Sequence, residues 1–168
     1  DVYKRQVQFD DWQHMDGAYG YLPNDRRHKL RLWGLYQATE RLTVSALATA
    51  QSGKPINAFG VDHPDSPLLI GPGRPTFYVR NPDESFTYNP RGLAGRTDWV
   101  HQLDLSAIYA FRWGDHTEVE LRADVFNLFD ADTATEVNEM AELQPQRFML
   151  PTAYQRPRQL RFGVAIRF

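Results

Sequence analysis

The chain has 168 residues, no cysteine and a net charge of −2, with 19 basic and 21 acidic side chains. This length allows one domain of ordinary size, and the lack of cysteine excludes a disulfide or thiolate-metal framework. The near balance of charge gives no electrostatic argument for nucleic acid as a partner. No apolar run reaches the roughly 18 residues that a membrane-spanning helix needs.

Five segments alternate apolar residues with polar or small ones, which is the two-residue period of a β-strand. The runs are about 10 to 13 residues long, whereas an ordinary strand has about 5 or 6 and a tilted membrane strand about 9 to 11. The alternation predicts one apolar and one polar side for each strand. We expect strands near residues 28–38, 42–51, 98–112, 117–128 and 158–168.

The connections between these segments differ sharply in length. Thr39–Arg41 and Arg112–His116 are short, whereas Ser52–Asp98 and Asp130–Pro157 are long and rich in glycine and proline. Short turns at one end and long loops at the other are typical of an outer-membrane barrel. Within the last loop, Thr133–Leu143 could form one or two helical turns.

These patterns predict an all-β fold, namely an antiparallel up-and-down transmembrane β-barrel fragment. We expect an open, curved sheet of five or six long strands with long extracellular loops. The aromatic residues Tyr36, Tyr109, Phe111 and Phe168 would then form an interfacial girdle. One face should carry Leu103, Leu105, Ala107, Tyr109, Val119, Leu121, Val164 and Ile166, and the other Asp104, Ser106, Glu118, Glu120, Arg122, Asp124, Arg161 and Arg167.

Several motifs occur in a specific order along the chain. They are "NDRRHKLRLWGLYQ", "SGKPINAFG", "NPRGLAGRTDWVHQLDLSAIYAF", "RADVFNLFD" and the closing "RPRQLRFGVAIRF". Over about Leu22 to Phe168 this set resembles the TonB-dependent outer-membrane receptors, in particular the Oar-like (carboxypeptidase-regulatory-like) subgroup. Such receptors are plugged barrels, and 22-stranded transporters are known. The resemblance implies that residues 1–168 are the C-terminal part of one barrel domain, with the plug domain absent.

The resemblance also implies a function and a set of partners. We expect a bacterial outer-membrane receptor that captures an unknown solute with its extracellular loops and imports it with energy from TonB. The implied partners are outer-membrane lipid, the barrel-assembly machinery and, through the missing plug, the TonB complex. Two alternatives stay open: a structural or adhesion barrel, and an outer-membrane hydrolase. No Ser/His/Asp triplet or cofactor motif is visible, so we expect no enzyme activity and no cofactor.

Candidate site residues fall into two groups. Phe77, Tyr78, Phe86 and Tyr88 in the first long loop could contact a ligand or pack the loop against itself. Arg161, Gly163, Ile166 and Phe168 resemble an outer-membrane assembly signal, although an amphipathic strand cut at random would look similar.

The charged residues suggest no metal site. The carboxylates of Asp130–Glu139 could hold a hard cation, but a solvated loop explains them better because the calcium-loop register is missing. The five histidines are scattered. The charged side of the strands could form a charge-paired surface or line a solute path.

Overall fold

The structure is a computed structural model that describes residues 12–65 and 75–168. It divides into two compact units, which are described separately. The sheet unit comprises Arg27–Ser52, Trp99–Thr133 and Tyr154–Phe168, and the loop unit comprises the described residues of Asp1–Arg26, Gly53–Asp98 and Ala134–Ala153. No helix among the described residues is long and apolar enough to cross a membrane.

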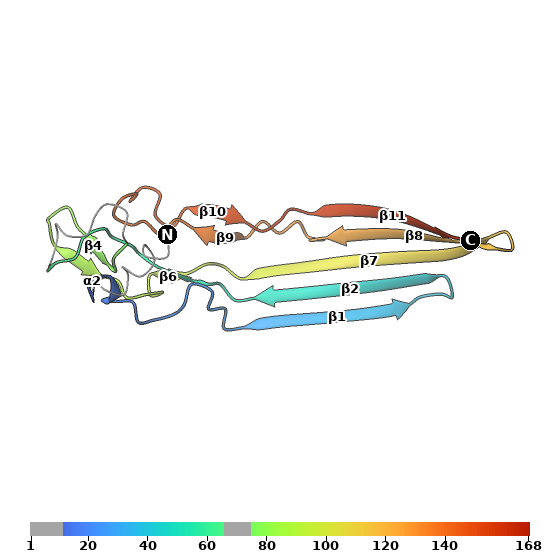
Figure 1. Cartoon of the computed structure of the whole chain (residues 1–168), viewed down its shortest axis with the longest axis horizontal. Coiled ribbons are helices and arrows are strands. Elements are labelled where there is room, and N and C mark those ends of the chain that lie inside the picture. The colour runs from blue at the N-terminus through green and yellow to red at the C-terminus, as the bar shows by residue number, and fades with distance from the viewer. Residues whose placement is uncertain (1–11, 66–74) are drawn as a thin grey trace, which may run out of the picture. The chain divides into compact units, whose positions relative to one another are not determined.

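The sheet unit is one five-stranded antiparallel sheet in the order β1-β2-β7-β8-β11 (Figure 1). The alternation of apolar and polar residues thus predicts all five strands, with boundaries within two residues of those expected. Among the described residues β1 and β11 are its edges, so the described chain does not close the sheet into a barrel. The strands are β1 (Lys29–Gln37), β2 (Leu42–Gln51), β7 (Val100–Trp113), β8 (Thr117–Phe126) and β11 (Gln159–Arg167).

The register separates the side chains of the sheet unit into two faces. Leu105 lies opposite Val125, and Leu121 lies opposite both Tyr109 and Val164, so apolar residues pair with apolar residues across the strands. Paired residues point to the same side of a sheet. The expected division into two faces is confirmed, because a slip of one residue would have inverted it.

We call these two sides the apolar face and the polar face. The apolar face includes Leu30, Leu32, Tyr36, Val44, Leu105, Tyr109, Leu121, Phe162, Val164 and Ile166. The polar face includes Arg31, Gln37, Ser45, Gln102, Asp104, Ser106, Glu120, Arg122, Asp124, Gln159, Arg161 and Arg167.

Short turns join the strands at one end of the sheet unit. In the β1–β2 turn the Thr39 hydroxyl accepts a hydrogen bond of 3.0 Å from the Leu42 N–H. In the β7–β8 turn Gly114 has a φ of 72°, a left-handed conformation that glycine adopts at little cost. Both long connections leave from the other end, as the sequence predicts.

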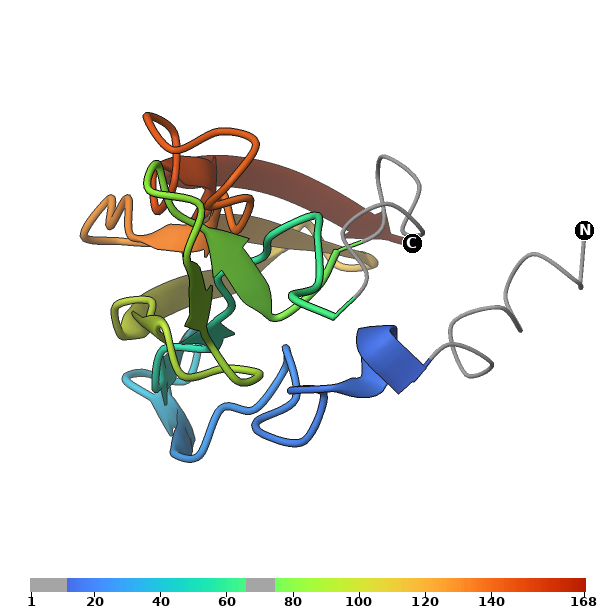
Figure 2. The ribbon, with the colours of Figure 1, turned by 90° about the vertical axis from the view of Figure 1, so that its left-hand side faces the viewer.

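The loop unit contains short paired strands and the helix α2 (Trp12–Met15). β4 (Tyr78–Arg80) and β5 (Phe86–Tyr88) form a hairpin, drawn in green in Figure 2. β3 (Pro55–Ile56) pairs with β6 (Gly95–Arg96), and β9 (Ala134–Val137) pairs with β10 (Pro151–Tyr154).

The suggestion of helical turns within Thr133–Leu143 is wrong. Residues Ala134–Val137 are extended because their backbone groups pair with the strand Pro151–Tyr154. The pairing continues beyond β9, where Asn138 and residues 149 and 150 exchange backbone hydrogen bonds of 2.9 Å. Tertiary pairing therefore overrides the local helical tendency of this segment.

The core of the described chain lies mainly in the loop unit. Ile56, Ala58 and Phe77 are buried there. Asn57, also buried, donates to the Glu139 carboxylate at 3.1 Å and accepts from the Gly92 N–H at 2.8 Å. By contrast, every residue of β1 and of β11 is exposed. The two edge strands therefore leave their large apolar side chains exposed, whereas Val119 of β8 is buried and β2 is half-buried.

Candidate functional site: the polar face of the sheet unit

A buried carboxylate between two arginines organises the polar face. Asp124 is only 2% exposed. The Arg122 Nε donates to its two oxygens at 2.9 and 3.0 Å, and the Arg161 Nε donates to Oδ2 at 2.8 Å. A buried carboxylate is tolerated when charged donors satisfy it. This cluster joins β8 to β11 across the polar face.

Further ion pairs lie toward the turn end of the same two strands. Arg167 contacts Glu120 at 3.4 Å and Glu118 at 3.8 Å. These side chains are more exposed than Asp124, so each pair contributes little to stability. The polar face thus has the charge-paired character that the sequence suggests.

Asn127 and Asp104 fasten the loop end of the polar face. The backbone N–H of Asn127 donates to the Asp104 carboxylate at 2.8 Å. The Asn127 amide donates to the carbonyls of Ala131 and Arg156 at 2.9 and 2.8 Å. Asn127 has a φ of 52°, and asparagine tolerates this left-handed conformation better than most residues. The residue therefore ties the end of β8 to the segment that enters β11.

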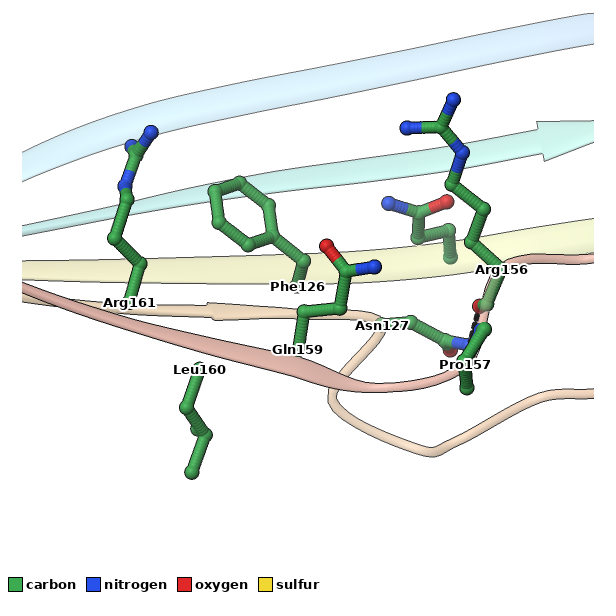
Figure 3. A pocket seen from close by; sticks show the side chains of 8 residues that line it. Phe126, Asn127, Arg156, Pro157, Gln159, Leu160 and Arg161 are labelled. Carbon is green, nitrogen blue, oxygen red and sulfur yellow. Dashed lines mark hydrogen bonds between the residues drawn. The ribbon is translucent and has the colours of Figure 1, made fainter.

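A cavity of about 400 Å³ opens beside this junction (Figure 3). Arg156 and Arg161 project from the same side of the sheet, with Phe126 and Gln159 between them. Leu160 projects from the opposite side. The residues that line the cavity are Gln102, Phe126, Asn127, Arg156, Pro157, Gln159, Leu160 and Arg161. The lining therefore combines two cationic side chains with amides and one aromatic ring.

A second polar cluster lies in the loop unit around Asp16. The Tyr78 hydroxyl donates to Asp16 Oδ2 at 2.6 Å, and His63 Nε2 lies 3.3 Å from the same oxygen. The bond from Tyr78 is the main cause that lowers the pKa of Asp16. The same bond raises the pKa of Tyr78 to about 12. The cluster joins parts of the chain that are far apart in sequence.

The loop aromatics proposed as ligand contacts lie in and beside the β4–β5 hairpin. Phe77 is 3% exposed and its ring lies 5.5 Å from that of Phe59. The rings of Tyr78 and Tyr88 are 4.9 Å apart. Phe86 is half-buried, whereas Tyr88 is 48% exposed. Phe77 and Tyr78 thus help to pack the loop unit, and a ligand contact for any of the four remains a prediction.

The residues of the proposed assembly signal lie on both faces. Arg161 and Gly163 belong to the polar face and Ile166 to the apolar face of β11, while Phe168 follows the strand and is 99% exposed. A Cβ on Gly163 would meet the Arg122 Cβ at 3.8 Å, an ordinary contact. Packing alone therefore does not require glycine there, and the assembly role remains a prediction.

Sequence reasoning missed the importance of Asn127 and Arg156. Asn127 lies within the motif "RADVFNLFD", but its partners follow it by 4 and 29 residues. The available signal was an asparagine at the end of a strand, a position where its side chain often caps backbone groups. Within residues 12–65 and 75–168, no three acidic, histidine or cysteine side chains gather as a metal site.

Comparisons with known proteins identify a relative. The chain is 25% identical over 203 residues to the "TonB-dependent transporter Oar" of Myxococcus xanthus, which covers 95% of this chain and 18% of that protein. A solved structure, the ferric-catecholate import receptor Fiu from E. coli K12 in its closed form, superposes with a TM-score of 0.47 and 20% identity. That match covers 92% of this chain and 16% of Fiu. No family model matches the chain.

The chain spans less than a fifth of the length of either protein. The relationship to Oar extends over nearly the whole chain, and it agrees with the ordered motifs of the sequence. The chain is therefore homologous to a segment of the TonB-dependent transporters.

Proposed function

We propose that the sheet unit forms five neighbouring strands in the wall of a transmembrane β-barrel in the bacterial outer membrane. The observation that supports this most is the apolar face. Val164 and Phe162 on β11 are 67% and 77% exposed, and Leu32 on β1 is 59% exposed. An exposed apolar surface that extends over whole strands needs a non-aqueous neighbour.

The length of the strands and the composition of their polar face also support a location in the membrane. The five strands have 9 to 14 residues, and a tilted strand needs about 9 to 11 to cross a bilayer. Alternation between lipid-facing apolar residues and lumen-facing polar ones is typical of such barrels. The ion pairs around Asp124 and Arg167 would then lie on the interior side.

The biological role is a receptor that captures a solute with its long loops and imports it with energy from the TonB complex. The homology to a TonB-dependent transporter supports this role. The barrel would require the assembly machinery and lipid as partners, together with a plug domain that contacts TonB.

Spin labels test the proposed membrane environment. The chain contains no cysteine, so single cysteines can be introduced one at a time and labelled. Leu121→Cys and Val164→Cys probe the apolar face, and the adjacent Glu120→Cys and Ala165→Cys are matched controls on the polar face. In lipid vesicles, the labels at residues 121 and 164 should collide often with dissolved oxygen and rarely with a water-soluble nickel chelate. Equal access of the chelate to both pairs would refute the membrane wall.

A depletion experiment tests transport separately. Cells with and without the complete protein are grown in complex medium, each with the TonB system intact or disabled. A transporter depletes at least one solute only when both the protein and TonB are present. An adhesion barrel leaves the medium unchanged in all four cultures, and a hydrolase forms products without TonB.

A further inference from the structure

The cavity beside Asn127 contains two guanidinium groups and no acidic lining residue. Arg156 has no side-chain hydrogen bond or ion pair within the described ranges 12–65 and 75–168, and Arg161 makes its described polar contact to Asp124 through Nε alone. The terminal nitrogens of both arginines are therefore available as donors. We propose that this cavity binds the oxyanion of a small solute, for example a carboxylate or a phosphate.

The Arg161 side chain is held in place before any ligand arrives. The Asp124 carboxylate holds the Arg161 Nε at 2.8 Å, and the Arg161 guanidinium carbon lies 5.2 Å from the centre of the Phe126 ring. A planar guanidinium fixed through Nε presents its remaining N–H groups as a fork that matches an oxyanion. Arg161 is thus oriented by contacts that leave its outer edge open.

The backbone around Arg156 is fastened on both sides. The Gln155 side chain donates to the His101 carbonyl at 2.7 Å, and the Asn127 amide donates to the Arg156 carbonyl at 2.8 Å. The Arg158 N–H donates to Asp130 at 2.7 Å. Because these contacts already order the backbone of this segment, binding a ligand costs less conformational entropy. Asn127 acts here as a positioning residue.

The local charge favours an anion. Arg122 and Arg161 are paired with the Asp124 carboxylate, whereas Arg156 lines a cavity whose lining includes no carboxylate. The Asp104 carboxylate accepts hydrogen bonds at Oδ1 from the Gln102 side chain and from the Asn127 N–H. One positive charge, that of Arg156, is left without a carboxylate partner in the described chain. A volume of about 400 Å³ is in the range of small-molecule sites.

This inference rests on the proposed function in one respect. A transmembrane barrel would place the polar face, and the cavity with it, on the interior side rather than against lipid. The imported solute would then belong to the chemical class that carries at least one oxyanion.

Calorimetric titration of the complete protein in detergent micelles tests the site. The probes are succinate and inorganic phosphate, and succinamide is the neutral match for succinate. The main variant is Arg156→Gln, which breaks no described side-chain contact and so should fold normally. Arg31→Gln is the matched control, because Arg31 also belongs to the polar face but lies on β1 and does not line the cavity.

We expect at least one anionic probe to bind the wild type saturably, whereas succinamide does not. Arg156→Gln should weaken binding about tenfold, because it removes a charge-assisted hydrogen bond to the anion. Arg31→Gln should leave the affinity unchanged. The inference is overturned if neither anion binds, or if Arg156→Gln binds as the wild type does. The spin labels on the apolar face report the membrane wall independently, so failure of the anion site is distinguishable from failure of the proposed barrel.

Discussion

At the scale of single residues, Asn127 shows how one residue can fasten three parts of the chain through its side chain and its backbone N–H. It is 2% exposed and satisfies the backbone of Ala131 and Arg156 while its own N–H is bound by Asp104. Two properties are combined here: an amide with donors and an acceptor, and tolerance of a left-handed backbone.

Two substitutions separate these properties of Asn127. Asn127→Ala removes the amide and also strains the left-handed backbone, so the free energy of unfolding should fall by about 3 kcal/mol. Asn127→Gly removes only the amide and should cost about 1 kcal/mol less than Asn127→Ala. Urea titration of the complete protein in lipid vesicles, followed by tryptophan fluorescence, measures both. Equal losses would show that backbone strain contributes nothing at this position.

The Asp16–Tyr78 hydrogen bond gives the loop unit a defined pH response. Because the pKa of Tyr78 is raised from its ordinary value of 10.0 to about 12, the bond stabilises fully below pH ~10 and is lost as pH rises through ~12. Because the pKa of Asp16 is lowered, its contribution is present above its unfolded value and is lost as pH falls through the lower folded value.

Replacing Asp16 tests the cause of the Tyr78 shift. Asp16→Asn should return the pKa of Tyr78 from about 12 toward 10.0, because the hydrogen bond to the Asp16 carboxylate is the largest cause of the shift. Ultraviolet titration of tyrosinate, with Tyr78→Phe to identify the signal, measures this change. An unaltered titration in Asp16→Asn would contradict the assignment.

At the scale of the element, adjacent residues of β11 lie on the apolar and the polar face in turn. Val164 lies opposite Leu121 on the apolar face, and Ala165 lies opposite Glu120 on the polar face. The two side chains differ by one position in sequence but point to opposite sides of the sheet. They therefore make a matched pair for testing what each face contacts.

A single arginine at either position should have very different effects. Val164→Arg should lower the free energy of unfolding in lipid vesicles by about 2 to 4 kcal/mol, the cost of an arginine deep in the lipid-facing surface of a barrel. Ala165→Arg should change it by less than about 1 kcal/mol, because the new charge lies beside Glu120 in water. Similar losses for both variants would argue against lipid at the apolar face.

At the scale of the whole molecule, chain order requires that both long connections leave one end of the sheet unit and both tight turns the other. In the proposed outer-membrane orientation, the long connections lie outside the cell and the turns lie in the periplasm. The β4–β5 hairpin belongs to the first long connection, and its turn contains Asp83 and Glu84.

Epitope insertions test this orientation. A tag between Asp83 and Glu84 should bind antibody on intact cells, whereas a tag between Gly114 and Asp115 should bind only after the outer membrane is opened. Both insertions lie in exposed turns, where added residues are tolerated. Antibody binding to the Gly114 tag on intact cells would reverse the orientation.

The sequence alone determined the five long strands, the membership of each face and the lengths of the connections. These properties depend on residues that are neighbours along the chain, because alternation has a period of two and a tight turn fixes the register of the strands it joins. The ordered motifs from "NDRRHKLRLWGLYQ" to the closing strand likewise indicated the relationship to a TonB-dependent transporter.

Only the tertiary structure decided how distant polar residues meet. Thr133–Leu143 contains a strand rather than helical turns because residues 151–154 supply its backbone partners. Asn127 reaches Arg156 across 29 positions, and Arg161 reaches Asp124 across 37. Such contacts depend on the pairing of β8 with β11 and on the path of the loop between them, which no local pattern encodes.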